Sequence, residues 1–252
     1  MGSSATPCVL VLAGLDPSGG AGLLADAEAI RAAGARPLCI ATALTAQTTR
    51  RLHGFQPLAP ALALQTAQAL LEEEPVRSIK VGMVGTAAMA RAIAGLLADA
   101  GVPAVVDPVL MASSGAALFQ GGPQAAAAAY SSLWPHAVLT PNAPEARVLL
   151  GLSEEPRDPA ALERAARELV RRGAQAVLVK GGHAEGAEAV DVLCTADSCE
   201  RLSAARIPGS GARGTGCRLA SALAAGLALG KPLPDAARAA KDFVTAYLRG
   251  VG

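Results

Sequence analysis

Residues 8–33 read CVLVLAGLDPSGGAGLLADAEAIRAA, and this stretch decides how the fold is built. The run 8–13 is an unbroken apolar segment of strand length, and 21–33 has the composition of a helix that stops at Gly34. Three glycines within 19–22 give the connection between them unusual backbone freedom. A buried strand that passes directly into a helix is the unit from which parallel α/β sheets are made.

The same unit recurs along the rest of the chain. We predict further strands over 37–43, 79–81, 104–107, 137–140 and 176–180, and helices over 62–74, 87–100, 159–172, 218–229 and 234–248. The strands are apolar on both faces, as expected when helices cover both sides of a sheet. Residues 187–207 interrupt the alternation and are typical of an antiparallel hairpin with a polar turn. The sequence therefore predicts an α/β fold with a mostly parallel central sheet and helices on both faces.

Length and charge restrict the remaining classes. No Pro/Ser/Gly-rich linker divides the chain, so we expect residues 1–252 to form a single domain. The net charge of +1 gives no long-range field for nucleic acid or an acidic membrane, and we expect neither as a partner. The pairs Arg50–Arg51 and Arg171–Arg172 are interpreted as solvated surface. With no apolar run near membrane length and no secretory pattern over 1–7, the expected location is the cytoplasm.

The cysteines do not predict a disulfide framework, because they are five in number and irregularly spaced. Cys194 and Cys199 flank a turn-like segment and could face each other across a hairpin. A zinc site at this pair would need two more ligands nearby, and the sequence offers none.

Ligands of such a sheet bind beyond the carboxyl ends of its strands, so polar residues that follow strands are the candidates. The loop from Gly14 to Gly22 allows close backbone approach to a ligand, or is simply a tight turn. Asp26, on the helix that follows, could bind a substrate amine or lie on the surface. Gln47 follows the next strand and carries both a donor and an acceptor, which suits the edge of a heterocycle as well as an ordinary loop.

A second group of polar residues suits phosphate and metal. Asp107 ends a buried strand and could hold Mg²⁺, or cap the turn before Pro108. Asn142 and Glu145 could organise Mg²⁺ and its waters, or form the capping box of a helix. Lys180 ends another buried strand, from which it could reach phosphate oxygens or extend to solvent.

The most specific segment is GSGARGTGC at 209–217, directly before a predicted helix. Backbone N–H groups of Gly214, Thr215 and Gly216 can form an anion hole there and stabilise a transferring phosphoryl group. Cys217 stands at the same helix end, where the helix dipole is expected to lower the pKa of its thiol, unless it is an inert core cysteine.

Seven segments together resemble the hydroxymethylpyrimidine and phosphomethylpyrimidine kinases of thiamine biosynthesis, within the ribokinase-like superfamily. They are, in order, AGLDPSGGAGLLAD, ATALTAQTT, KVGMVGT, VVDPVLMASSG, LTPNAPEA, VKGGH and GTGC, and the resemblance runs from about Val9 to Leu248. It implies a ribokinase-like three-layer sandwich that uses ATP and Mg²⁺. The implied reaction is phosphorylation of 4-amino-5-hydroxymethyl-2-methylpyrimidine and of its monophosphate.

On the substrate side, the resemblance implies that Asp26 and Gln47 hold the aminopyrimidine and that Gly14 lines the same pocket. Cys217 stands where sugar kinases of the superfamily carry a catalytic Asp. We hypothesise that Cys217 receives the substrate proton late in a loose transition state, so that Cys217→Ala lowers turnover by orders of magnitude without unfolding the protein.

On the phosphate side, Asn142 and Glu145 match the superfamily's Asn-x-x-Glu element, which manages Mg²⁺ and phosphate. Lys180 matches a phosphate-contacting lysine, and Gly214, Thr215 and Gly216 match the anion hole. The chain departs from the family where Arg213 replaces a frequent His and Ala116 replaces an acidic residue. These changes bear on the second phosphorylation more than on the first.

Two alternatives stay open at this point. A kinase for pyridoxal or pyridoxine would also act on a hydroxymethyl group attached to a nitrogen heteroaromatic ring. A non-catalytic pyrimidine-binding protein would keep Asp26 and Gln47 but lose the phosphate chemistry. The resemblance also leads us to expect a homodimer.

Overall fold

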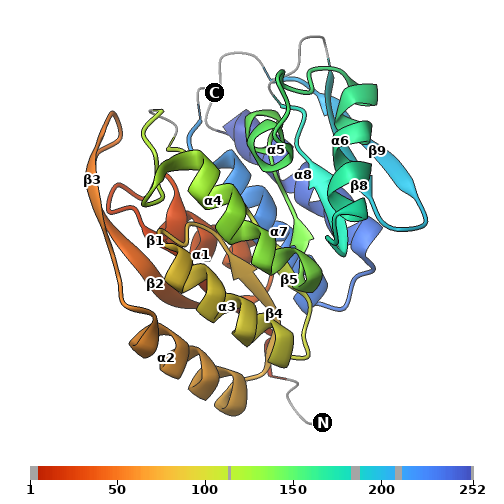
Figure 1. The fold of residues 1–252 in the computed structure, drawn as a ribbon. Helices are drawn as coiled ribbons and strands as arrows, with labels where there is room; N and C mark the ends of the chain where they lie inside the picture. The colour runs from red at the N-terminus through yellow and green to blue at the C-terminus, as the bar shows by residue number, and fades with distance from the viewer. Residues whose placement is uncertain (1–4, 113–114, 183–187, 208–211, 251–252) are drawn as a thin grey trace.

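The computed structural model describes residues 5–112, 115–182, 188–207 and 212–250, and within them nine strands form one sheet (Figure 1). The order across the sheet is β3-β2-β1-β4-β5-β6-β7-β8-β9. The strands are β1 (Cys8–Leu15), β2 (Arg36–Gln47), β3 (Leu52–Pro57), β4 (Val76–Val81), β5 (Ala104–Val106), β6 (Val138–Leu139), β7 (Ala176–Val179), β8 (Glu188–Cys194) and β9 (Cys199–Ala205). The helices are α1 (Gly22–Ala32), α2 (Pro60–Glu73), α3 (Ala87–Asp99), α4 (Gly122–Tyr130), the 3₁₀ helix η1 (Ser131–His136), α5 (Ala143–Leu150), α6 (Pro159–Arg171), α7 (Thr215–Ala228) and α8 (Leu233–Gly250).

The central strands β2, β1, β4, β5, β6 and β7 are parallel, and the edges are antiparallel. One edge is β3, paired with β2, and the other is the β8–β9 hairpin, paired with β7. The predicted mostly parallel sheet and the predicted hairpin are therefore confirmed.

Three elements are absent from the sequence prediction: β3, α4 and the 3₁₀ helix η1. The edge strand β3 reads LHGFQP and carries no continuous apolar run, because an edge strand is only partly covered. The helix α4 reads GPQAAAAAY, in which a run of alanines gives no polar and apolar periodicity.

Alternate residues of β1 enter two separate cores, which explains why its sequence is apolar throughout. Cys8, Leu10 and Leu12 pack in one core, together with residues of the helices from α2 to α6. Val9, Val11 and Ala13 pack in the other core, with α1, α7 and α8. Each such large apolar side chain contributes about 1.5–3 kcal/mol when it is fully buried, so both helical layers are held to the sheet.

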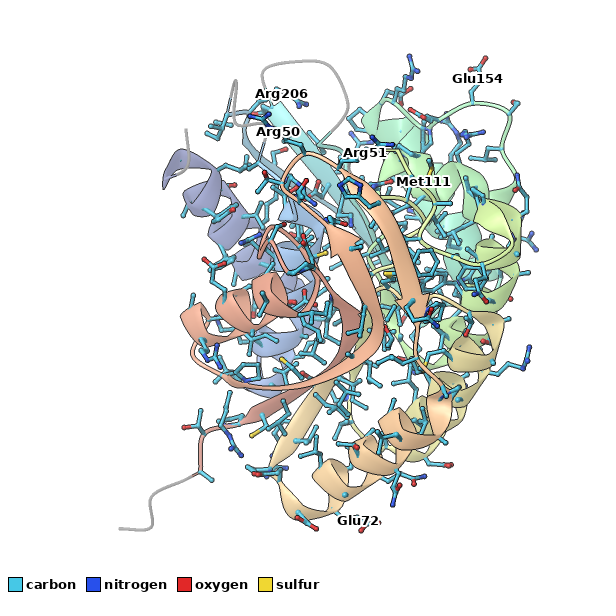
Figure 2. All side chains as sticks on the ribbon, turned by 90° about the vertical axis from the view of Figure 1, so that its left-hand side faces the viewer. Arg50, Arg51, Glu72, Met111, Glu154 and Arg206 are labelled. Atoms are coloured by element: carbon cyan, nitrogen blue, oxygen red, sulfur yellow. A yellow bond between two sulfur atoms is a disulfide. The ribbon has the colours of Figure 1, made fainter. Side chains whose placement is uncertain are left out.

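The carboxyl ends of the parallel strands meet at one edge of the molecule. Figure 2 shows Arg50, Arg51 and Met111 at this end and Glu72 at the opposite end. Arg50 and Arg51 are exposed, as are Arg171 and Arg172, which confirms their assignment to solvated surface. The residues that follow β1, β2, β5, β6 and β7 are thereby brought together, as the strand–helix pattern predicts.

Cys194 and Cys199 form a disulfide across the last pair of the β8–β9 hairpin, with their Cα atoms 4.1 Å apart. The facing arrangement that the sequence left open is therefore present. Among the described helices, none combines the length and the apolar character that a membrane span requires.

Candidate active site

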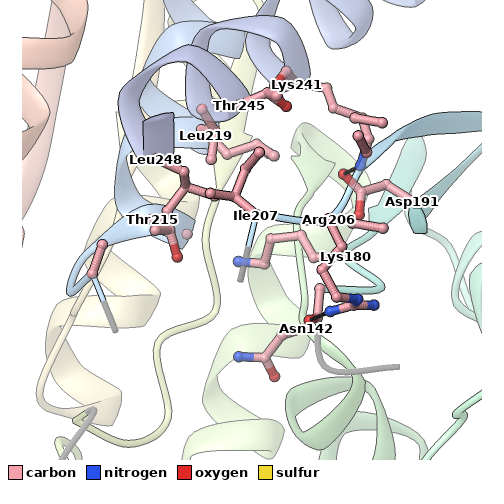
Figure 3. A pocket seen from close by; sticks show the side chains of 17 residues that line it. Asn142, Lys180, Asp191, Arg206, Ile207, Thr215, Leu219, Lys241, Thr245 and Leu248 are labelled. Carbon is pink, nitrogen blue, oxygen red and sulfur yellow. Dashed lines mark hydrogen bonds and ion pairs between the residues drawn. The ribbon is translucent and has the colours of Figure 1, made fainter. Parts of the chain in front are cut away.

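Two adjoining cavities lie at the carboxyl ends of the strands. The larger has a volume of about 540 Å³ and the smaller, shown in Figure 3, about 340 Å³. Five residues line both cavities, namely Asn142, Lys180, Ala212, Thr215 and Gly216. Since these include the predicted anion hole and phosphate lysine, the two cavities meet at a site suited to phosphate.

The loop after β1 forms one wall of the larger cavity, and Asp16 organises it. This carboxylate is 4% exposed and accepts hydrogen bonds from the backbone N–H of Ser18 (2.9 Å) and of Ala21 (3.1 Å). It also accepts a bond from Nε2 of Gln47 at 2.9 Å, which holds the amide at the cavity wall beside Gly14. Sequence reasoning gave Asp16 no role, although an Asp two residues before a Ser signals such a turn.

Asp26 lies in a buried ion pair with Lys80. It is fully buried, its Oδ2 bonds Lys80 Nζ at 2.8 Å, and its Oδ1 accepts a bond from Ser221 Oγ at 2.8 Å. Of the two ion-paired residues, Lys80 lines the larger cavity and Asp26 does not. Direct contact of Asp26 with the substrate stays a prediction, since each of its carboxylate oxygens already accepts one hydrogen bond and the residue does not line the cavity.

Lys80 is the residue that sequence reasoning missed. It lies within β4 and is buried, and burial alone would lower its pKa. The carboxylate of Asp26 outweighs this effect, so the pKa of Lys80 is raised and the side chain is a cation. The sequence did contain a sign of this role. Lys80 stands between Ile79 and Val81 in a strand that is apolar on both faces, and a buried charge needs a partner.

Asp107, Lys180 and Glu145 form a second charged cluster where the cavities meet. Lys180 Nζ lies 2.7 Å from Asp107 Oδ1 and 3.9 Å from Glu145 Oε2. Burial favours a neutral lysine, but the two carboxylates prevail and raise the pKa of Lys180. Burial raises the pKa of Glu145 to about 7, with Lys180 opposing the shift. One cation thus faces two carboxyl groups, of which Glu145 is only partly ionised near neutral pH, and a bound metal cation would favour its ionised form.

Asn142 and Glu145 also form the capping box of α5. Asn142 Oδ1 accepts a bond from the Glu145 N–H, and Glu145 Oε2 accepts one from the Asn142 N–H, both at 2.8 Å. The capping alternative left open by the sequence is present, and both side chains still line the larger cavity. Helix capping therefore fixes two site residues in place.

The predicted anion hole lies at the start of α7, where two glycines allow close contacts. Gly214 has φ +69°, and a Cβ there would lie 2.1 Å from the carbonyl oxygen of Gly20. A Cβ at Gly216 would lie 2.9 Å from Lys180 Nζ, so a larger residue there would make this ammonium group shift away from the turn. Together with Thr215, these residues present the unpaired N–H groups of a 14-residue helix next to a lysine.

Cys217 lines the larger cavity, but its thiol differs from the expectation. Burial raises its pKa to about 12, while nearby Lys80 acts in the opposite direction. The expected lowering by the helix dipole is wrong for this environment, because loss of water around the sulfur outweighs it. Cys217 therefore carries its own proton at neutral pH.

The smaller cavity lies between the β8–β9 hairpin and α8 (Figure 3). Apolar side chains, including Ile207, Leu219 and Leu248, line much of it. At its floor Lys241 Nζ bonds Asp191 Oδ2 at 2.8 Å, and Asp191 Oδ1 accepts the N–H of Gly181 at 2.8 Å. An apolar slot that opens onto phosphate-binding groups has the chemistry of a nucleotide site.

Some quoted motif residues, namely 113–114, His183 and 208–211, lie outside the described residues. Within the described part of the chain no group of three or more His, Cys, Asp or Glu side chains could hold a metal alone. A Mg²⁺ ion needs fewer protein ligands than this, because water and phosphate oxygens complete its shell.

Comparison with known proteins agrees with this architecture. Residues 16–251 match the family model described as phosphomethylpyrimidine kinase. A hydroxymethylpyrimidine/phosphomethylpyrimidine kinase from Rhizobium meliloti (strain 1021) is 41% identical over 244 residues, covering 96% of this chain and 91% of that protein.

Solved structures share the fold. A phosphomethylpyrimidine kinase from Clostridium difficile 630 superposes with a TM-score of 0.79 at 30% identity, covering 96% of this chain and 99% of that one. The pyridoxal kinase from Staphylococcus aureus, solved with AMP-PCP and pyridoxal, has a TM-score of 0.85 at 28% identity, covering 97% and 89%.

The three-layer sandwich and its paired cavities define a ribokinase-like small-molecule kinase. Within that class, the chain belongs to the hydroxymethylpyrimidine/phosphomethylpyrimidine kinase family.

Proposed function

We propose that this protein transfers the γ-phosphoryl group of ATP to 4-amino-5-hydroxymethyl-2-methylpyrimidine and then to its monophosphate, in thiamine biosynthesis. The observation that carries the proposal is the shared wall of the two cavities. The nucleotide occupies the smaller cavity and the pyrimidine the larger. The γ-phosphate of ATP and the hydroxymethyl group of the pyrimidine then meet at Lys180, Thr215 and Gly216, which line both cavities.

The family's use of Mg²⁺ fits the residues present. Asp107 and Glu145 offer two carboxylates that face a single lysine, and Mg²⁺ is commonly bound through one or two carboxylates plus phosphate oxygens. These two residues would hold the ion, which when bound offsets charge on the nucleotide phosphates. Asn142 would contribute by fixing Glu145 through the capping box.

The protein's own groups then account for most of the catalysis. Phosphoryl transfer has a loose transition state, so positioning and charge stabilisation matter more than early proton removal. The N–H groups at Gly214–Gly216 and the Lys180 ammonium bind the transferring phosphoryl oxygens. Cys217, which is protonated at neutral pH, positions the attacking hydroxyl instead of acting as its base. As the new O–P bond forms, the bond from the γ-phosphorus to the β–γ bridging oxygen breaks and ADP leaves, and the hydroxyl proton passes to an oxygen of the transferred phosphoryl group or to water.

The heterocycle is placed by the loop after β1. Gln47, held by Asp16, presents its amide to the ring edge, and Gly14 lets the ring approach the backbone. Asp26 holds Lys80 at the floor of the cavity.

The test is Mg²⁺-dependent ADP release from ATP with four acceptors. These are hydroxymethylpyrimidine, its monophosphate, pyridoxal and hydroxyethylthiazole. Turnover of both pyrimidines is the expected result. Thermal stabilisation by the pyrimidine without ADP release would instead revive the non-catalytic binding alternative.

The fold shared with pyridoxal kinases favours phosphorylation of pyridoxal as a second candidate function. Their substrate also carries a hydroxymethyl group on a nitrogen heterocycle, and the 540 Å³ cavity has room for it. Competition between pyridoxal and the pyrimidine separates the two: turnover of pyridoxal alone, with no use of the pyrimidine monophosphate, would replace the primary proposal.

We also propose that the enzyme works in the cytoplasm as a homodimer. This follows from the family resemblance, and light scattering tests it. A particle of twice the 25.1 kDa chain mass is expected, and one of 25.1 kDa would contradict it.

A further inference from the structure

The larger cavity is lined by three acidic residues, Asp16, Asp107 and Glu145, and by more cations than these. Four cationic side chains line it, which are Lys80, Arg147, Lys180 and Arg213. Lys80 is committed to Asp26 at 2.8 Å, and Lys180 to Asp107 at 2.7 Å. A neutral hydroxymethyl acceptor brings no charge that calls for further cations.

Among the described residues, the Arg147 side chain makes no hydrogen bond or ion pair, whereas Arg213, next to the anion-hole turn, is held by three long contacts. Arg213 Nη2 lies 3.4 Å from Asp16 Oδ2, and its Nη1 lies 3.3 Å from Ser18 Oγ and 3.1 Å from the carbonyl oxygen of Thr48. These distances are at the long end for N–H···O bonds, and charge-assisted pairs are usually near 2.7–2.9 Å. The guanidinium is 21% exposed, so it can exchange these contacts for a better anion.

Asp16 does not depend on Arg213. The same carboxylate already accepts bonds from Ser18 and Gln47 at 2.7–2.9 Å. Departure of the guanidinium removes the ion-pair partner of Asp16, but the carboxylate keeps its hydrogen bonds to neutral donors, which limits the cost.

The backbone of Arg213 is held through Arg218, which has a short ion pair of its own. Arg218 Nη1 donates to the carbonyl oxygen of Arg213 at 3.3 Å and to that of Gly20 at 3.2 Å, and Arg218 Nη2 bonds Glu28 at 2.7 Å. Arg213 also directly precedes Gly214 in the anion-hole turn. A movable guanidinium on a backbone held through Arg218 thus stands between the anion hole and the Gln47 side of the cavity.

We infer that Arg213 binds the phosphate of a phosphorylated acceptor and thereby determines specificity for the second phosphorylation. The inference rests on the proposed function. In that step an oxygen of the acceptor's phosphate attacks the γ-phosphorus of ATP, the bond from the γ-phosphorus to the β–γ bridging oxygen breaks, and ADP leaves. Two phosphoryl groups must then share a place that holds one in the first step. The planar guanidinium can bind two phosphate oxygens at once, which suits it to offset this added charge.

The experiment compares kcat/KM for hydroxymethylpyrimidine and for its monophosphate in wild type, Arg213→Ala and Arg213→Lys. In Arg213→Ala we expect kcat/KM for the monophosphate to fall by about 10- to 100-fold. For the alcohol it should fall only a few-fold, through loosening of the loop at Asp16. Arg213→Lys keeps the positive charge but cannot bind two phosphate oxygens in the same plane, so its kcat/KM for the monophosphate should lie between those of Arg213→Ala and wild type. Arg36→Ala is the matched control: Arg36 is also ion-paired but lies at the start of β2, away from the site, and both values should stay at wild type.

Calorimetry without nucleotide adds a readout independent of turnover. Arg213→Ala should weaken binding of the monophosphate by about 10-fold or more and leave binding of the alcohol within about threefold. An equal loss of affinity for both acceptors, or no loss for either, would overturn the inference. Arg213 would then have only a structural role, through its contacts with Ser18 and Thr48. If wild type phosphorylates no pyrimidine, the proposed function fails, and the binding ratio still decides whether Arg213 recognises phosphate.

Discussion

The protein contains two buried lysine–aspartate pairs of almost the same length that differ in what surrounds them. Lys80 and Asp26 are 2.8 Å apart with both side chains at 0% exposure, and Ser221 occupies the other carboxylate oxygen. Lys180 and Asp107 are 2.7 Å apart at 11% and 3% exposure, and a second carboxylate, Glu145, lies 3.9 Å from the same ammonium. The first pair is closed and neutral. The second borders both cavities, and beside it Glu145, with a pKa of about 7, adds a carboxyl group that is partly ionised at neutral pH.

The difference shows that the groups around an ion pair decide its role. A closed pair has no remaining bond to offer, and removing one partner leaves an uncompensated charge in the core. A pair with an extra carboxylate and access to a cavity can exchange its partners for phosphate and metal. The same two residue types thus provide support at one site and reactivity at the other.

Removing the cation of the closed pair should have the largest effect. Lys80→Met leaves Asp26 buried and unpaired, so we expect the free energy of unfolding to fall by about 3–5 kcal/mol. Urea unfolding measures this, and Lys80→Met combined with Asp26→Asn should recover much of the loss. A loss below about 1 kcal/mol in Lys80→Met would contradict the idea that the closed pair supports the fold.

Removing the cation of the open pair should affect the reaction more than the fold. In Lys180→Met we expect kcat to fall by about 100- to 1,000-fold, because one preorganised donor to the transferring phosphoryl group is lost. Its free energy of unfolding should fall by less than that of Lys80→Met, since the stranded carboxylates adjoin cavities that water can enter. Lys231→Met, at an exposed position, is the control and should keep wild-type kcat. Greater destabilisation than in Lys80→Met would reverse the comparison.

Cys217 stands near both lysines and should respond as a positioning group. We expect Cys217→Ala to lower kcat by about 100-fold, because the acceptor hydroxyl is then misplaced. The unfolding midpoint should stay close to wild type. Cys39→Ala, which removes another free cysteine, should leave kcat unchanged. Unaltered turnover in Cys217→Ala would remove the thiol from the mechanism.

The smallest effect concerns the thiol itself. Its pKa of about 12 means that alkylation should keep rising about tenfold per pH unit beyond pH 9. The rate at an ordinary thiol levels off near its pKa of about 8.5. Lys80 lowers the pKa of Cys217, so Lys80→Met should raise it further and slow labelling a few-fold at a given pH. Peptide mass spectrometry after timed iodoacetamide exposure measures both rates, and a plateau below pH 9 would contradict the assignment.

The sequence alone reached most of the fold and much of the site. Apolar strand runs, helix stops at glycine and the polar residues after each strand were sufficient to predict the parallel sheet and its active edge. Gly14, Gln47, Asp107, Asn142, Glu145, Lys180 and the residues from Gly214 to Cys217 all line the larger cavity. The strand β3 and the helix α4 escaped because neither carries a hydrophobic period of its own.

The pairing of these charges, in contrast, depends on tertiary contacts. Sequence places Asp26 on a helix after a glycine-rich loop, but it cannot show that Lys80, 54 residues later, reaches the same carboxylate. Likewise, a cysteine at a helix start has a low expected pKa until burial, which depends on the whole fold, reverses the shift. Local patterns determine strands, turns and helix ends because those depend on near neighbours. Ion pairing and desolvation depend on residues far apart in the chain, so they appear only when the sheet brings them together.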